Sequence, residues 1–420
     1  MIMKEWATRM ELFKREKYLE RIRPFYDTDD LIKVITGIRR CGKSSLMLMI
    51  KDELKNQGVP EDNIIFLDLD LRSYRKIKDA DSLESLIEEK AKDTEEGVVY
   101  LFIDEVQNVP GFEEILNGFR AEGGYSIFIT GSNSYLLSGE LVTKLTGRYL
   151  EFEMYTLSFD EYIHMKEYYG KPVHSNLAAE LNTYISEGGF PRAILIDEPE
   201  AKKTYVQGVV GEIFEKDIKR RTKIKDVHAF ESVRNYCINN FGSAMTISSI
   251  CDGLRKSGIA ITRATVSKYI QVLMDAKILY ECRRFDLKSK KSLTNEKKYY
   301  LADLGIYYAT NTDNRINYGP NLENIVYIYA RSMNYSVSIG RIGKLECDFI
   351  LRGSDQEYAY VQVSYTIALS EATEEREYRP LEEIRDNYPK YLMTTDFVLQ
   401  KRNGIRHVNL MDFMMAGNKF

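Results

Sequence analysis

The first third of the chain carries short apolar runs that predict strands and one periodic stretch that predicts a helix. Residues 31–37 (LIKVITG) are mainly apolar and rich in β-branched side chains, which is typical of a buried strand. In residues 44–54 (SSLMLMIKDEL) apolar side chains recur three and four positions apart, as on one face of a helix. Residues 97–107 and 125–133 predict further buried strands that end in polar side chains. This alternation predicts an α/β core.

The rest of the chain shows three other patterns. Residues 163–222 are mostly helical in periodicity, with EGGFP as a loop between helices, which is typical of a helical lid. Residues 244–306 predict two helices joined by a turn, then two strands joined by the lysine-rich segment 288–296, which is the order of a winged helix-turn-helix. Residues 319–367 predict a helix followed by three strands, and the tail predicts an amphipathic helix and a last strand.

Composition excludes several classes of protein. A chain of 420 residues is long enough for roughly two to four domains. No apolar run approaches the roughly 18 residues of a membrane span, and the charged N-terminus lacks a signal-peptide core, so we expect a cytoplasmic protein without a membrane partner. The five cysteines are scattered without a CxxC, which favours reduced thiols over disulfides or a zinc site.

Charge is distributed unevenly along the chain. The net charge of −4 predicts no overall attraction to nucleic acid, but residues 243–310 hold twelve Lys and Arg against six Asp and Glu. We therefore expect DNA as a partner of this segment, although winged helices also dock on proteins. Our DNA-contact candidates lie at the start of the second helix and in the wing: Arg263, Thr265, Ser267, Lys268, Lys288, Lys290 and Lys291.

A phosphate-binding motif joins the first strand to the first helix. Residues 37–44 fit the pattern G-x-x-x-x-G-K-[ST], whose glycines let backbone N–H groups surround phosphate oxygens. We expect Lys43 to reach the β- and γ-phosphates and the Ser44 hydroxyl to bind Mg²⁺. The nucleotide-binding candidates are Gly37, Ile38, Arg39, Arg40, Cys41, Gly42, Lys43, Ser44 and Ser45.

An acidic pair ends the strand in residues 97–107. Four apolar residues before Asp104 and Glu105 form a Walker B pattern, in which Asp104 holds Mg²⁺ and Glu105 activates the attacking water. The adjacent glutamate favours hydrolysis over phosphoryl transfer, and the lack of an NKxD tetrapeptide favours ATP over GTP. Asn133, after the next strand, is a candidate to contact the γ-phosphate or the water. Arg148 is a candidate arginine finger, in cis or from a neighbouring subunit, or else an ordinary surface ion pair.

Five segments occur in an order that resembles one family: GIRRCGKSSL, FIDEVQNVPGFE, ITGSNSYLLSGELVTKLTGR, LSFDEY and EGGFPRA. They are similar to bacterial and archaeal AAA+-type ATPases related to the archaeal replication-initiator ATPases. The resemblance covers essentially the whole chain. It implies an α/β P-loop core with a parallel sheet (residues 1–160), a helical lid (161–225), a winged helix (226–314) and a C-terminal α/β domain that resembles restriction endonucleases of the PD-(D/E)XK type (315–420).

The C-terminal segment matches that nuclease pattern only in part. The resemblance places the acidic positions at Glu323, Asp348 and Gln362 and the lysine position at Ser364. A serine cannot supply the positive charge of an ammonium group beside a pentavalent phosphate, so we expect a degenerate and inactive nuclease. Glu346, two residues before Asp348 on the same strand face, is a candidate substitute ligand.

These observations favour an ATP-binding, Mg²⁺-dependent ATPase that acts as a DNA-associated switch or motor, with a protein partner or self-assembly as further expectations. An ATP-gated nuclease and a nucleotide-regulated protein-interaction module that never touches DNA remain alternatives.

Overall fold

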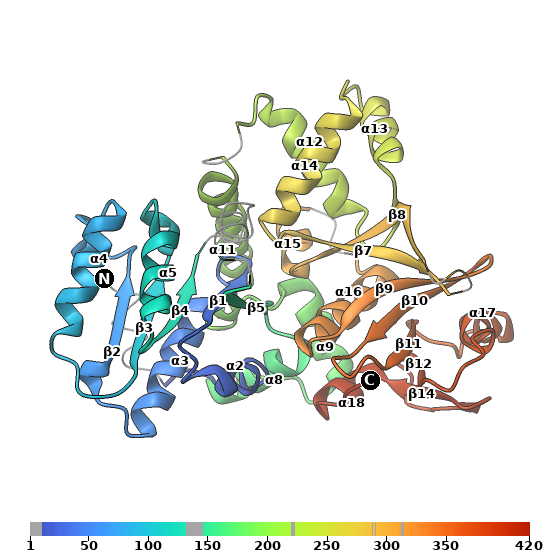
Figure 1. Cartoon of the computed structure of the whole chain (residues 1–420). Coiled ribbons are helices and arrows are strands. Elements are labelled where there is room, and N and C mark those ends of the chain that lie inside the picture. Colours follow the sequence, from blue (N-terminus) through green and yellow to red (C-terminus); the bar gives the residue numbers. More distant parts are fainter. Residues whose placement is uncertain are drawn as a thin grey trace. The chain divides into compact units, whose positions relative to one another are not determined.

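The computed structural model describes residues 11–131, 145, 147–219, 223–287, 289, 291–311 and 315–420, without the side chains of residues 291–296. The chain forms two compact units, Met1–Met154 and Tyr155–Phe420. Figure 1 shows the first unit from blue to teal and the second from green to red. The division into four domains at residues 160, 225 and 314 stays a prediction.

The first unit is built on a five-stranded sheet in which every pair of neighbours is parallel, in the order β2-β3-β4-β1-β5. This confirms the predicted parallel α/β core. Its strands are β1 (Ile32–Gly37), β2 (Ile64–Asp68), β3 (Val99–Asp104), β4 (Tyr125–Thr130) and β5 (Tyr149–Met154). The predicted strands correspond to β1, β3 and β4, and every residue of β1 and β3 is buried.

Helices cover this sheet (Figure 1), and their apolar faces form its core. The helices and short 3₁₀ segments are α2 (Glu16–Ile22), η1 (Arg23–Phe25), α3 (Lys43–Asn56), η2 (Glu61–Asn63), η3 (Arg72–Tyr74), α4 (Ala80–Ala91), η4 (Val106–Asn108) and α5 (Phe112–Glu122). Leu83 of α4 and Leu116 of α5 pack in one core with Val34 and Leu101 of the sheet. Because all strands are parallel, β1 and β3 present their last residues at the same edge.

The second unit begins with helices and ends in a mixed sheet. Its helices are α8 (Phe159–Tyr168), α9 (Leu177–Glu187), α10 (Pro191–Ile194), α11 (Pro199–Glu212), the π-helix η5 (Ile213–Ile218), α12 (Val227–Asn239), α13 (Ile247–Lys256), α14 (Arg263–Asp275), α15 (Leu304–Thr310), α16 (Tyr318–Ser332), α17 (Glu371–Glu382) and α18 (Leu410–Met415). The strands are β6 (Ala244–Met245), β7 (Leu279–Asp286), β8 (Lys291–Leu301), β9 (Ser336–Ile342), β10 (Leu345–Arg352), β11 (Tyr358–Val363), β12 (Lys390–Thr394), β13 (Lys401–Arg402) and β14 (Ile405–Asn409).

The nine strands that the structure describes in this unit belong to one sheet, in the order β13-β14-β12-β11-β10-β9-β7-β8-β6. The hairpin β7–β8, which the sequence assigns to a wing, continues the C-terminal sheet because β7 pairs in parallel with β9. Figure 1 shows β7 and β8 beside β9 and β10. Residues of the hairpin therefore lie next to residues of α16 and β10. Within the described residues, no helix combines the length and apolar character needed to cross a membrane.

Candidate functional site

The phosphate-binding loop leaves room for glycine alone at its first position. Gly37 ends β1 with φ 139°, and a Cβ there would lie 2.2 Å from the carbonyl oxygen of Met154 and 2.8 Å from Sγ of Cys41. Gly42, at φ 111°, precedes α3, and no side chain caps this helix. The loop thus ends at a helix N-terminus whose backbone N–H groups face an anion site.

Two basic side chains contact the carbonyl groups of the loop. Nζ of Lys43 lies 2.9 Å from the oxygen of Gly37 and 3.3 Å from that of Ile38. The buried guanidinium of Arg15 donates to the carbonyl of Cys41 at 3.0 Å. No local pattern indicates the role of Arg15, because it lies 26 residues before its acceptor.

The acidic pair lies at the same sheet edge. Asp104 is buried, and one of its carboxylate oxygens accepts a hydrogen bond from the hydroxyl of Thr130 at the end of β4. The same hydroxyl accepts from the N–H of Glu105 at 3.3 Å. Thr130 therefore positions both acidic residues. Sequence reasoning missed it and chose polar residues further along, of which Asn133 lies outside the described residues.

Glu105 has a strained backbone. Its φ of 56° and ψ of 45° are left-handed, which costs a non-glycine residue of order 1 kcal/mol and is found most often at functional positions. Gln107 donates to its carboxylate. Burial raises the pKa of Glu105, and Lys43 and Arg39 oppose that rise. A raised pKa suits a carboxylate that accepts a proton from water.

These residues fit ATP and Mg²⁺. A glycine loop at an uncapped helix end suits phosphates, and the half-exposed Lys43 supplies a cation there. The exposed Ser44 and the buried Asp104 are oxygen donors of the kind Mg²⁺ prefers, and the ion, when bound, neutralises charge on the phosphates.

Arg148 lies at the other edge of the sheet. Its carbonyl accepts from the N–H of Ile32, the first residue of β1, at 2.9 Å, and its guanidinium donates to Asn117 at 3.2 Å. The six residues of β1 separate it from Gly37 by about 16–20 Å. Action of Arg148 in cis does not fit this geometry, and action from a neighbouring subunit stays a prediction.

The DNA-contact candidates of α14 lie in its first two turns. Arg263, Ser267 and Lys268 are exposed, whereas Thr265 is partly buried and bonds to the capping residue Thr262. Lys288 and Lys290 lie outside the described residues, as does the side chain of Lys291.

The positive charge of this segment is less available than the sequence suggests. Lys297 and Arg283 contact the carboxylate of Glu281, at 2.7 Å and 2.6 Å. Lys298 and Arg284 point into the unit, toward carboxylates of α16 and β10. Lys298 and Arg284 therefore do not face solvent, and Lys297 and Arg283 are partly neutralised, so the surplus of positive charge that faces solvent is smaller than a count along the chain implies.

The nuclease-like residues surround one of those cations. Nζ of Lys298 lies 2.9 Å from Glu323, 3.0 Å from Glu346 and 3.9 Å from Asp348, and its side chain is 7% exposed. Burial would lower the pKa of Lys298, but Glu323, Asp348 and Glu346 raise it. Burial and Glu323 raise the pKa of Asp348, against the opposing effects of Lys298 and the N–H of Val363. Burial would also raise the pKa of Glu346, but Lys298 and Arg284 lower it.

The two altered positions do not complete a metal site. Gln362 donates to the carboxylate of Glu377 at 2.9 Å, and its oxygen accepts from the N–H of Asp348 at 3.3 Å. The hydroxyl of Ser364 lies 3.4 Å from the carbonyl of Thr366. In the part of the chain that the structure describes, no three His, Cys, Asp or Glu side chains form a group that could hold a metal ion.

Comparisons with known proteins identify the family. An uncharacterized protein of Haemophilus influenzae is 37% identical over 406 residues, which cover 96% of this chain and 99% of the relative. An uncharacterized protein of Methanocaldococcus jannaschii is 30% identical over 89% of this chain and 83% of its own length. The chain belongs to the family of these two proteins. A family model described as an AAA domain matches residues 29–163, and one described as a domain of unknown function matches residues 178–315.

The fold of this family also has a solved counterpart. The Walker-type ATPase PABY2304 of Pyrococcus abyssi superposes with a TM-score of 0.51 at 16% identity, over 72% of this chain and 96% of that one. At this identity the likeness concerns the fold alone. Together with the AAA-domain match and the geometry at Gly37–Ser45, Asp104 and Glu105, it makes the first unit an AAA-type, nucleotide-binding ATPase domain.

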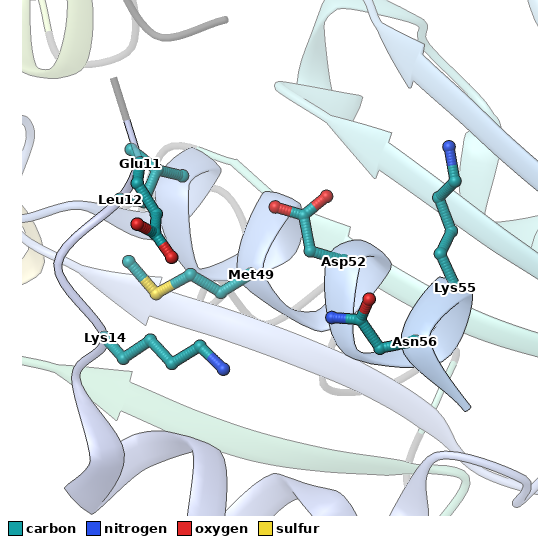
Figure 2. A pocket seen from close by; sticks show the side chains of 7 residues that line it. All are labelled: Glu11, Leu12, Lys14, Met49, Asp52, Lys55 and Asn56. Atoms are coloured by element: carbon teal, nitrogen blue, oxygen red, sulfur yellow. The ribbon is translucent and has the colours of Figure 1, made fainter. Parts of the chain in front are cut away.

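The first unit also has a pocket that is separate from the phosphate-binding loop. It measures about 300 Å³ and is lined by Glu11, Leu12, Lys14, Met49, Asp52, Lys55 and Asn56. Figure 2 shows these side chains on the segment before α2 and on the second half of α3, away from the loop at the start of that helix. Their mixture of opposite charges indicates a polar surface hollow.

Proposed function

We propose that this protein is a Mg²⁺-dependent ATPase that acts as a DNA-associated switch. The observation that carries the hydrolytic part is the arrangement of Asp104 and Glu105 on Thr130, at the sheet edge that holds the phosphate-binding loop. Gly37–Ser45 binds the phosphates of ATP, Lys43 and Mg²⁺ offset their charge, and Glu105 takes the proton of the attacking water. Arg148 of a neighbouring subunit completes the site if the protein assembles.

The DNA-associated part rests on α14. Its exposed N-terminal residues Arg263, Ser267 and Lys268 suit a helix that enters the major groove, in a winged helix made of α12–α14 with β7 and β8. Since Lys297, Lys298, Arg283 and Arg284 of the hairpin β7–β8 contact carboxylates of the chain, we expect DNA affinity to depend on α14 and on the lysines of residues 288–291. The five cysteines are free and buried, which suits a reducing cytoplasm.

The decisive experiment compares ATP hydrolysis by the full chain and by Glu105→Gln, each alone, with duplex DNA and with branched DNA. We expect Glu105→Gln to bind ATP and to hydrolyse it about 100-fold or more slowly. If Glu105→Gln hydrolyses ATP as fast as the wild type, Glu105 is not the base.

A matched pair of variants separates DNA from other partners. Arg263→Ala with Lys268→Ala removes two exposed cations of α14, whereas Lys216→Ala with Lys219→Ala removes two exposed or half-exposed cations outside this segment. We expect only the first pair to weaken DNA stimulation and its salt dependence. Turnover indifferent to every DNA would favour the protein-interaction module, and capture of a protein by an ATP-trapped Glu105→Gln would then identify its partner.

A further inference from the structure

Three carboxylates of the second unit converge on one ammonium group. Glu323 comes from α16, and Glu346 and Asp348 come from β10, while Lys298 reaches them from β8. The hydroxyl of Tyr300, two residues along β8, donates to Glu323 at 2.8 Å. A lysine that stays charged when it is buried to this degree needs partners that compensate its lost hydration, and here three carboxylates do so.

Four of the six carboxylate oxygens that a metal ion could use already have a close partner. The same oxygen of Glu323 accepts from Lys298 and Tyr300, and Glu346 contacts both Lys298 and Arg284. One oxygen of Asp348 accepts from the N–H of Val363 at 2.8 Å. Mg²⁺ binds oxygen at about 2.0–2.1 Å, so an ion on Glu323 and Glu346 would lie against the ammonium nitrogen, and two buried cations in contact repel. The residues present do not fit a divalent ion.

We propose that the ammonium of Lys298 occupies the place of a divalent cation in this cluster, so that the C-terminal part of the unit works without metal. The ion pairs of the cluster then join the hairpin β7–β8 to α16 and β10. The nuclease pattern places a lysine at position 364, which is serine here. Lys298 of β8 brings an ammonium group to the same carboxylates and serves as their counter-ion. An ATP-gated nuclease loses its metal site under this proposal. The inference does not depend on the proposed ATPase function.

Mn²⁺ binding to the nucleotide-free full chain tests the proposal, measured by electron paramagnetic resonance and by calorimetry. We expect the wild type to hold no Mn²⁺ at the cluster and Lys298→Ala to bind one ion about tenfold or more tightly than the wild type, because three carboxylates lose their cation. Lys298→Ala with Asp348→Asn should lose that ion again. Lys297→Ala is the matched control, since the neighbouring Lys297 pairs with Glu281 and is not part of the cluster.

Two outcomes would overturn the proposal. One is wild-type Mn²⁺ binding that Asp348→Asn abolishes, because the cluster would then hold a metal beside Lys298. The other is Lys298→Ala with a native circular dichroism spectrum and no gain of Mn²⁺. If Lys298→Ala does not fold, the comparison of wild type with Asp348→Asn still decides, and Lys298→Met, which keeps the aliphatic stem, provides the second test. None of these readouts involves ATP hydrolysis.

Discussion

Lys33 is a buried lysine whose replacement should change the stability of the protein in opposite directions at two pH values. It lies in the middle of β1 and is fully buried, with Nζ 2.5 Å from the carbonyl of Thr28 and 2.8 Å from the hydroxyl of Ser126. The ammonium lies 4.6 Å from the ring centre of Phe128. Burial lowers the pKa of Lys33 from 10.5 to about 7, although Asp29, Asp30 and Asp27 oppose this.

The sign follows from proton uptake. Between about pH 7 and pH 10.5 the unfolded chain holds a proton that the folded chain has released, so the free energy of unfolding rises with pH in this window. The slope is about 1.4 kcal/mol per pH unit, or about 5 kcal/mol over the window. At pH 7 the proton that the unfolded chain holds on Lys33 destabilises the fold by most of these 5 kcal/mol, and Lys33→Met removes this effect. The variant also loses two hydrogen bonds worth about 1 kcal/mol each. We therefore expect the free energy of unfolding of Lys33→Met to exceed that of the wild type by about 2 kcal/mol at pH 7 and to fall below it by about 1–2 kcal/mol near pH 10.

Urea unfolding of the full chain at pH 7 and pH 10, followed by circular dichroism, measures this difference. Lys92→Met, which removes an exposed lysine of the same unit, controls for the loss of one positive charge. Parallel pH profiles for wild type and Lys33→Met would refute the reasoning, because the titration of other groups cancels in the comparison.

Two glycine substitutions give further tests. Gly37→Ala would place its Cβ 2.2 Å from the carbonyl oxygen of Met154, and we expect ATP hydrolysis to fall about 100-fold or more, whereas Gly118→Ala, with no atom within 4 Å, should leave turnover unchanged. Gly188→Ala would place its Cβ 1.9 Å from Oδ1 of Asp303 at a φ of 78°, so we expect the second unit to lose about 3 kcal/mol or more in thermal or urea unfolding. Gly208→Ala in α11 has open space and should cost nothing, so equal losses in both variants would contradict the steric argument.

Local patterns predicted much of the first unit. A mainly apolar run predicts a strand buried on both faces, and β1, β3 and β4 are buried almost throughout, even at Lys33 of β1 and Ser126 of β4. The phosphate-binding loop is also local, because its glycines, Lys43 and Ser44 are consecutive. Thr130 and Arg15 were not predictable, since each acts through a contact with a residue at least 25 positions away.

In the second unit, contacts between residues far apart in the sequence decide even more of the structure. Its helices and the hairpin β7–β8 follow the predicted order, but the pairing of β7 with β9 joins residues some 55 positions apart. The lysine position two residues after Gln362 is serine, and the cation comes instead from β8. The count of positive charge over residues 243–310 therefore overstates the charge that faces solvent, because Lys298 and Arg284 contact carboxylates inside the unit.

The EGGFP segment, which the sequence marked only as a loop, is explained by one buried carboxylate. Asp303 accepts from the N–H of Gly189 and of Gly305, each at 2.8 Å, and Thr156 donates to the neighbouring carbonyl of Ala302 at 2.8 Å. Burial raises the pKa of Asp303 to about 7, against the hydrogen bonds that lower it. The folded unit therefore loses stability as pH rises from about 4 to 7, because the unfolded chain releases this proton first.

An apolar residue at position 303 would avoid this loss of stability with rising pH, but it could not accept hydrogen bonds from the two N–H groups of Gly189 and Gly305. The hydroxyl of Thr156 joins the segment that follows the ATPase unit to the carbonyl of Ala302, just after β8, and Lys298 lies four residues before Ala302 on that strand. The start of the second unit and the carboxylate cluster thus share one strand. A displacement of residues 156–162 must either break the bonds to Asp303 and Ala302 or move β8. For a switch driven by the preceding ATPase domain, β8 is the element that we expect to respond first.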